Sequence, residues 1–279
     1  NTVGENQNFL GANTPKQLVY VDIDGGTSTE TFFSDVTIEP LDAATLDPSL
    51  AGRTNTLVNG GPGVIGMMDN LNTIFTTIPD SLSMSLNAQT FTSADLTALG
   101  GDLDNLPDGL TFTTTNPADF GFDPDTEFTT LFVGVTSLDG EGAELLGLAD
   151  SIDLLNIDKA DEAIVFVENF TGLSDRASTT GKLNDYSRVL ANIVAHELGH
   201  VLGLNHQPTN FVDFLLIDDD PDNDPLTPSD ANLGPGLMAY TPTDTLLSDL
   251  LELGTAPITR SEFPIGNIDT VDMLLRALS

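Results

Sequence analysis

The chain has 279 residues, of which 39% are hydrophobic, and this is enough apolar material to bury a core in one large domain or two modest ones. Its 43 acidic and 8 basic residues give a net charge of −35, which excludes non-specific binding to nucleic acid and disfavours docking on an anionic membrane surface. The chain contains no cysteine and therefore no disulfide or thiolate metal site, and it has no apolar run of the roughly 18 residues that membrane insertion requires.

The first part of the chain predicts a polar arm followed by short strands and one helix. Residues 1–16 are polar and rich in glycine and asparagine, which is typical of a loosely held terminus. Residues 18–23 are mostly apolar and end before a pair of glycines, so we expect a strand there, and residues 36–38 predict a second short strand. In residues 63–78 the apolar side chains recur at helical spacing, which predicts a helix.

The middle of the chain alternates between irregular segments and strands. Residues 87–109 contain two adjacent glycines and several aspartates, so we expect an irregular excursion. Residues 110–115 and 129–136 are rich in threonine and valine and are expected to be strands. Residues 163–167 form an uninterrupted apolar run with β-branched residues, which is the strongest strand signal in the chain.

A long buried helix is expected from about residue 185 to residue 202. Asn184 or Asp185 offers an N-cap, and apolar residues on several faces predict that the helix is buried. The chain then changes character, with an acidic, proline-rich loop over residues 213–230 and two further predicted helices. Strands and helices before the long helix, and loops and helices after it, predict an α+β fold with two lobes that share one cleft.

The chemically informative segment is His-Glu-Leu-Gly-His-Val-Leu-Gly-Leu-Asn-His, which begins at His196. His196 and His200 are four residues apart on the predicted helix, so they lie on one face about 6 Å apart along its axis and can bind one metal ion. Glu197 follows the first ligand, where its carboxylate can reach a metal-bound water without ligating the metal. Gly203 can adopt a positive φ and end the helix, which lets His206 turn back as the third ligand. Three imidazoles leave one zinc position open for water, and an open position marks a catalytic site.

Coincidence and a structural role are the alternatives for this motif. The chain has only three histidines and all of them fall within the motif, which argues against a chance grouping of scattered residues. A structural zinc site would explain the histidines, but it would not explain the glutamate beside the first of them.

The motif resembles the signature of the metzincin clan of zinc metallopeptidases, which also contains a downstream methionine turn. The segment Gly-Leu-Met-Ala-Tyr that contains Met238 resembles this turn. The resemblance implies that Met238 lies beneath the zinc ligands as an apolar floor. It also implies that Tyr240, as in the astacin and serralysin branches, binds zinc in the resting state or stabilises the oxyanion during turnover. Ordinary core packing for the methionine, and surface or packing roles for the tyrosine, are the alternatives.

The resemblance is closest over residues 185–240, and it is to the bacterial matrixin-like and serralysin-like members of the clan. It implies a twisted mixed sheet with helices in an upper lobe, a mostly irregular or helical lower lobe, and an active-site cleft between them. We therefore expect residues 1–16 to be an N-terminal arm and residues 17–279 to be a metzincin-like catalytic domain. Its upper lobe would span residues 17–203 and its lower lobe residues 204–279.

The function that the resemblance implies is that of a secreted zinc endopeptidase, which hydrolyses peptide bonds with a zinc-bound water and Glu197 as general base. Glu197 would then protonate the leaving amine, and Tyr240 would stabilise the oxyanion. The strand at residues 163–167 would be the edge strand above the cleft, where an extended substrate could add to the sheet. The peptide or protein substrate is expected not to be acidic, because the negative enzyme repels acidic sequences.

The excess of acidic residues has two interpretations, salt adaptation and calcium binding. Both suit an extracellular protein, and since the first residues are not a secretory signal, we expect that a signal was removed or never existed. Calcium prefers hard oxygen ligands, and two aspartate clusters are candidate sites, one before residue 163 and one in the acidic loop. Asp22 and Asp24 are a third candidate, and solvated acidic surface is the alternative for all three. The two clusters comprise Asp150, Asp153, Asp158, Asp161, Asp218, Asp220, Asp222 and Asp224.

Two other functions compete with proteolysis. A catalytically silent metzincin fold could serve as a calcium-dependent binding module, although such a module has no use for Glu197. A zinc hydrolase that acts on a non-peptide amide would carry the same motif.

Overall fold

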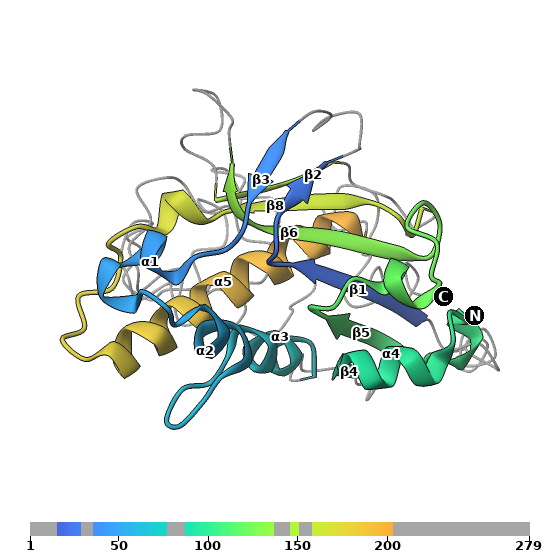
Figure 1. The fold of residues 1–279 in the computed structure, drawn as a ribbon, viewed down its shortest axis with the longest axis horizontal. Coiled ribbons are helices and arrows are strands. Elements are labelled where there is room, and N and C mark those ends of the chain that lie inside the picture. The colour runs from blue at the N-terminus through green and yellow to red at the C-terminus, as the bar shows by residue number, and fades with distance from the viewer. Residues whose placement is uncertain (1–15, 29–35, 77–86, 137–145, 151–157, 203–279) are drawn as a thin grey trace, which may run out of the picture.

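The computed structural model of the chain describes residues 16–28, 36–76, 87–136, 146–150 and 158–202. Within these residues the fold is a twisted mixed sheet with helices packed against it (Figure 1). The α+β class expected from the sequence is therefore confirmed.

Parallel strands form the centre of the sheet. β1 (Lys16–Asp22) pairs in parallel with β5 (Gly109–Thr113) on one side and with β6 (Phe128–Thr136) on the other. β4 (Ala88–Phe91) extends the sheet beyond β5, also in parallel. Parallel neighbours need a crossover connection, and the chain supplies one by passing through helices between β1 and β4 and again between β4 and β5.

The other side of β6 is covered by β8 and then by β7. β8 (Glu162–Phe166) runs parallel to β6 and antiparallel to β7 (Gly147–Ala149). The prediction that residues 163–167 form the edge strand is therefore wrong, because β8 has a neighbour on both sides. Among the described strands β7 pairs only with β8, so β7 lies at this edge of the sheet. A short antiparallel pair, β2 (Gly26–Thr27) and β3 (Thr37–Glu39), joins the C-terminal end of β6.

The side chains of β8 alternate between two cores on opposite faces of the sheet. Ala163 and Val165 belong to the main core with the helices, while Ile164 and Phe166 belong to a smaller core on the other face. All four side chains are fully buried. An uninterrupted apolar run is typical of a parallel strand with both faces covered, and this is why β8 gives the strongest strand signal but does not suit an edge.

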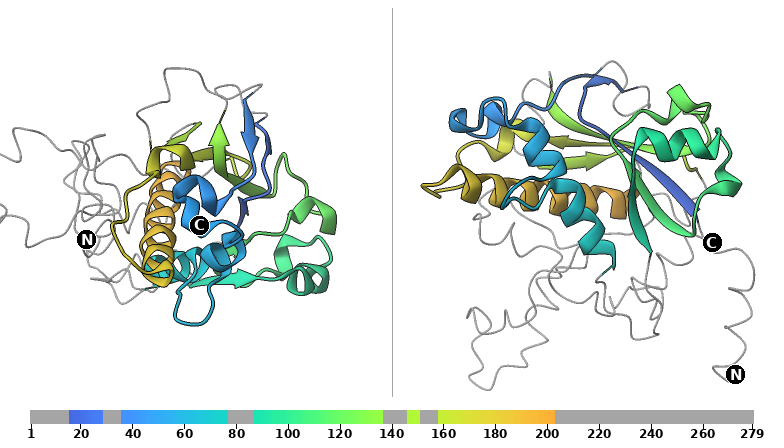
Figure 2. Two further views of the ribbon diagram at one scale, coloured as in Figure 1. Left: turned by 60° about the vertical axis from the view of Figure 1, so that its left-hand side comes forward. Right: turned by 60° about the horizontal axis from the view of Figure 1, so that its bottom comes forward.

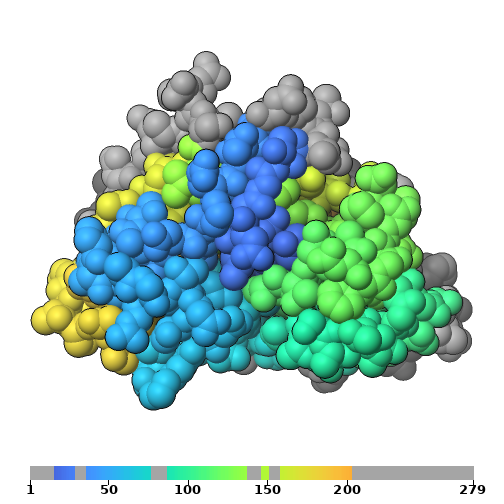
Figure 3. Space-filling model, in the orientation of Figure 1, coloured from blue at the N-terminus to red at the C-terminus, as the bar shows by residue number. Residues whose placement is uncertain are grey.

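The two longest described helices cover much of the main core. α3 (Met67–Thr76) packs along α5 (Thr179–Val201), and α5 also contacts β6, β7 and β8 (Figure 2). The face shown in Figure 3 is formed largely by β2, β3, α1 (Ala43–Leu46), α2 (Thr54–Asn59) and α4 (Ser93–Leu99), and the C-terminal end of α5 is not seen on it. In the part of the chain that the structure describes, no helix combines the length and apolar character needed to cross a membrane. The shorter elements are α1 (Ala43–Leu46), η2 (Pro48–Leu50), α2 (Thr54–Asn59), α4 (Ser93–Leu99), η3 (Leu103–Asn105), η4 (Pro117–Phe120) and η5 (Val167–Phe170).

α5 begins earlier than the sequence predicts. It starts at Thr179, and the N-cap is Ser178, whose hydroxyl oxygen accepts the N–H three residues further on at 3.1 Å. Asn184 and Asp185, the predicted caps, lie inside the helix. Asp185 is buried and accepts a hydrogen bond of 2.7 Å from the hydroxyl of Ser174. The prediction of the cap is therefore wrong, because these polar side chains serve contacts between segments.

The segment of residues 87–109, expected to be irregular, contains β4 and α4. α4 begins with a reciprocal capping box, in which the hydroxyl of Thr92 accepts from the N–H of Asp95 and the carboxylate of Asp95 accepts from the N–H of Thr92 at 2.8 Å. A threonine followed three residues later by an acidic residue is a recognisable helix start, so α4 could have been found from the sequence.

Tyr186 joins α5 to two other segments of the core. Its hydroxyl donates to the carbonyl of Leu46 and accepts from the N–H of Ser174, each at 3.2 Å, and the residue is fully buried. Tyr186→Phe leaves both backbone groups without this partner, so we expect it to lower the free energy of unfolding by about 1–3 kcal/mol. Urea denaturation followed by circular dichroism measures the change, and an unchanged midpoint and slope would contradict it.

Candidate metal centre

His196 and His200 lie one turn apart near the C-terminal end of α5. Their ring centroids are 4.9 Å apart and the ring planes are nearly perpendicular, at 87°. Both residues are buried, with 7% and 8% of their surface exposed. The structure thus brings two of the three predicted zinc ligands together on one face of a buried helix.

Glu197 follows His196 in the sequence and lies against β7 in space. It is 5% exposed, and the backbone N–H of Ala149 donates a hydrogen bond to its carboxylate. Burial raises the pKa of Glu197 to about 8, and the hydrogen bond from Ala149 opposes part of this rise. A carboxyl group with this pKa can both accept and release a proton near neutral pH.

The chemistry of these side chains fits a zinc ion. Neutral imidazoles are typical zinc ligands, and two of them on adjacent turns of a helix can share one metal. A carboxylate and two imidazoles buried together carry a desolvation cost that a bound cation offsets. The third predicted ligand, His206, lies outside the described residues. Among the residues that are described, no group of three or more histidine, cysteine, aspartate or glutamate side chains is placed to hold a metal.

The predicted residues beyond α5 are also outside the described part of the chain. α5 ends at Val201, with Leu202 as its C-cap, so the observed end is one residue before the predicted end. Gly203, Met238 and Tyr240 lie beyond it, as do the whole predicted lower lobe and its two helices. The roles assigned to these residues stay predictions.

The calcium candidates that the structure describes lie around β7 and β8. Asp150 follows β7, and its N–H donates to the carbonyl of Glu162 at 3.0 Å. Asp158 is exposed, and its carboxylate accepts the N–H of Ala160 at 3.0 Å, whereas Asp161 is buried directly before β8. In the part of the chain that the structure describes, these three aspartates do not form a group that could hold a calcium ion. The other members of the two clusters lie outside the described residues: Asp153, Asp218, Asp220, Asp222 and Asp224.

Asp22, the third calcium candidate, closes the turn that follows β1. Its Oδ1 accepts the backbone N–H of Asp24 at 2.9 Å and that of Gly25 at 3.1 Å. It also accepts a hydrogen bond from the side chain of Tyr20, and burial raises the pKa of Asp22. These hydrogen bonds give the Asp22 carboxylate a structural role in the turn.

β7 is the part of the site that the sequence analysis missed. Its three residues, Gly-Leu-Ala, are too few for a period-two pattern and include only one large apolar side chain. Leu148 packs against the smaller core, while Ala149 contacts the main core and donates to Glu197. No local sequence pattern predicts such a strand, because its position depends on pairing with β8.

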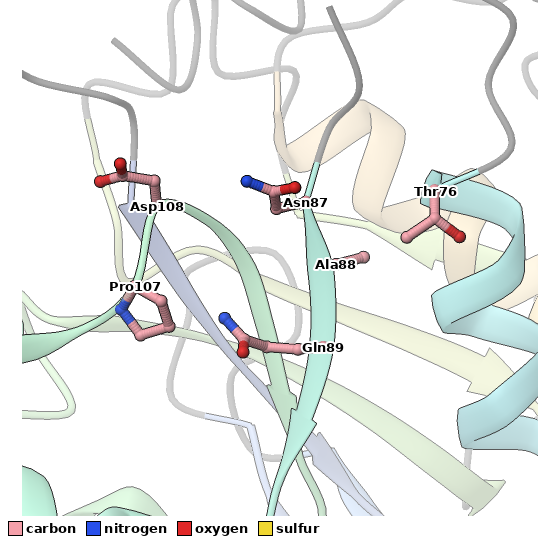
Figure 4. Close-up of a pocket in the computed structure, with 6 residues that line it drawn as sticks. All are labelled: Thr76, Asn87, Ala88, Gln89, Pro107 and Asp108. Carbon is pink, nitrogen blue, oxygen red and sulfur yellow. The ribbon is translucent and has the colours of Figure 1, made fainter.

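A polar cavity of about 560 Å³ lies elsewhere, between the end of α3 and the start of β4 (Figure 4). None of the predicted site residues lines it, and its wall carries amide, hydroxyl and carboxylate groups without a histidine. The residues that line it are Thr76, Asn87, Ala88, Gln89, Pro107 and Asp108.

Comparison with protein-family models, with curated proteins and with solved structures finds no significant match for this chain. The interpretation of its function therefore depends on the motif and on the geometry at the end of α5.

The raised pKa of Glu197 predicts how the stability of the metal-free protein depends on pH. Between its ordinary value of 4.5 and about 8, the unfolded chain loses the Glu197 proton while the folded chain keeps it, so this group makes stability fall as pH rises. Glu197→Gln removes the titration, and we expect the metal-free variant to gain stability relative to the native protein as pH rises from 4.5 to 8. The gain is up to about 1.4 kcal/mol for each unit of pKa shift.

Chemical denaturation of both proteins after exhaustive chelation, at several pH values, measures this difference. All other titrating groups are common to the two proteins, so their contributions cancel. A stability difference that does not change between pH 4.5 and 8 would show that Glu197 titrates normally.

Proposed function

We propose that the protein is a secreted zinc endopeptidase of the metzincin type. The observation that carries this proposal is the arrangement at the end of α5, where the rings of His196 and His200 lie 4.9 Å apart and the buried Glu197 is held under the edge strand. Two imidazoles for a metal and a separate carboxylate for proton transfer are the combination that metal-assisted hydrolysis requires.

The zinc ion would be held by His196, His200 and, from beyond the described end of α5, His206. When bound, zinc polarises the substrate carbonyl and lowers the pKa of a water molecule to about 7. The helix contributes rigidity, because the residues around the two histidines are buried against α3 and the sheet. Met238 is proposed as the apolar floor beneath the ligands.

Glu197 would act first as general base and then as general acid. Its carboxylate accepts a proton from the attacking water and later donates it to the nitrogen of the leaving amine. The hydrogen bond from Ala149 keeps the carboxylate in one place, and burial excludes competing water. Tyr240 is proposed to donate a hydrogen bond to the oxyanion of the substrate.

An extended substrate could pair with the side of β7 that faces away from β8, where the described part of the chain supplies no further strand. The backbone groups of Leu146 and Asp150 pair with β8. Because backbone groups alternate in direction along an antiparallel strand, those of Gly147 and Ala149 point away from β8. The N–H of Ala149 already contacts Glu197, so a peptide that pairs with Gly147 would lie close to the general base.

The catalytic assignment predicts that Glu197→Gln abolishes proteolysis but keeps the metal. We expect kcat on an unfolded protein substrate such as casein to fall at least about 100-fold, because general acid–base catalysis contributes roughly 10²–10⁴. Zinc per chain, measured by mass spectrometry of the metal, should stay at the native level, whereas His200→Ala should lose both zinc and activity.

The exposed Glu39 offers a matched control, and Glu39→Gln should keep the native rate. A native protein that binds zinc and cleaves no peptide would reject the proposal, and so would full activity of Glu197→Gln.

The net charge of −35 predicts the preferred substrates. Peptides with the same scissile bond but flanked by acidic residues should be cleaved more slowly than peptides flanked by basic residues, because like charges repel. The ratio of the two kcat/KM values should shrink as salt is raised from 0.01 M to 1 M, over which the Debye length falls from about 30 Å to about 3 Å. Equal cleavage of both peptides at low salt would contradict this prediction.

A further inference from the structure

Gly147 lies directly against the carboxylate of Glu197. A Cβ atom at Gly147 would lie 2.6 Å from Cγ and 2.7 Å from Cδ of Glu197, and it would also overlap Oε1. The three nearest atoms all belong to this one side chain. Among the described residues, Glu197 is therefore the first side chain that a Cβ atom at Gly147 would meet.

The strand itself does not require glycine at this position. Gly147 is not among the glycines with positive φ, and it pairs with Val165 in the regular ladder between β7 and β8. Other glycines differ in this respect. At Gly134 and Gly66 an added Cβ would overlap backbone atoms of neighbouring segments, so those glycines serve the packing of the chain.

The consequence of a side chain at Gly147 would fall on Glu197. The backbone of β7 is held by β8, whereas the glutamate side chain can rotate, so the glutamate is the group that gives way. A rotated Glu197 side chain would lose the hydrogen bond that the backbone N–H of Ala149 donates to it. Ala149 is the next residue after Gly147 on the same face of β7. The position of the carboxylate therefore depends on the absence of a side chain two residues before Ala149.

We propose that Gly147 is a positioning residue for the general base, which leaves open the space where the Glu197 carboxylate meets the N–H of Ala149. This inference rests on the proposed function, in which Glu197 transfers the proton. It goes beyond the motif, because Gly147 is outside it by about fifty residues and belongs to a different element of the fold.

The test compares Gly147→Ala with Gly26→Ala. Gly26 is also a strand glycine, but a Cβ there would lie at an ordinary 3.4 Å from Phe132, so this variant controls for the added methyl group. We expect Gly147→Ala to keep its zinc and its KM and to lose kcat by about 100-fold, the effect of misplacing a catalytic group by about 1 Å. Gly26→Ala should keep the native kcat.

A thermodynamic cycle provides a readout that does not depend on activity. Glu197→Ala removes the three atoms that lie nearest to a Cβ at Gly147. We therefore expect Gly147→Ala to lower the unfolding temperature in the native background and to leave it unchanged in the Glu197→Ala background. The double variant should therefore fold as well as Glu197→Ala, even if Gly147→Ala alone does not fold.

The outcomes separate the two proposals. An active native enzyme with equal kcat for Gly147→Ala and Gly26→Ala overturns the inference on Gly147 and leaves the proposed function standing. An equal loss of stability from Gly147→Ala in both backgrounds also overturns it. A native protein that binds zinc and cleaves nothing overturns the proposed function, and the role of Gly147 in catalysis falls with it.

Discussion

The burial of one carboxylate beneath the edge of the sheet is the constraint on which the rest of the site depends. Glu197 is enclosed by β7, and the cost of removing its charge from water appears as a pKa of about 8. β7 in turn is held only by its pairing with β8 among the described strands. The site therefore needs three elements, because α5 carries Glu197, β7 supplies the N–H that meets its carboxylate, and β8 holds β7 in the sheet.

The sequence predicts well those elements whose burial produces a local pattern of apolar residues. β1, β5, β6 and β8 carry runs of apolar or β-branched residues, and all of them have strands on both sides. β4 and β7 are held by pairing with strands that lie far away in the sequence, so their own residues predict them only weakly. Contacts with distant segments also explain why the sequence predicts the start of α5 too late. Asn184 looks like a cap, but its amide binds the backbone of Gly63 and Ile65 at 3.0 and 2.9 Å.

The same distinction between local and distant contacts applies to the residues of the site. His196, Glu197 and His200 belong to one helix, and a spacing of four residues is enough to place the two rings on one face. The partner of Glu197 comes from β7, about fifty residues earlier, and no spacing rule connects the two. The wrong assignment of the edge strand has a physical cause as well. The resemblance places the edge strand at an apolar run, although such a run favours a strand with both faces covered.

The short length of β7 has a consequence for how the molecule behaves at high concentration. Unpaired backbone groups at the rim of a sheet invite a strand from another copy and can start aggregation. The edge strand β7 has only three residues and so offers few such groups, and the N–H of Ala149 already donates to Glu197. Mutual repulsion between copies that each carry a charge of −35 adds a second barrier. The short length of β7 and the charge of the chain thus both act against pairing of this edge with a second copy of the protein.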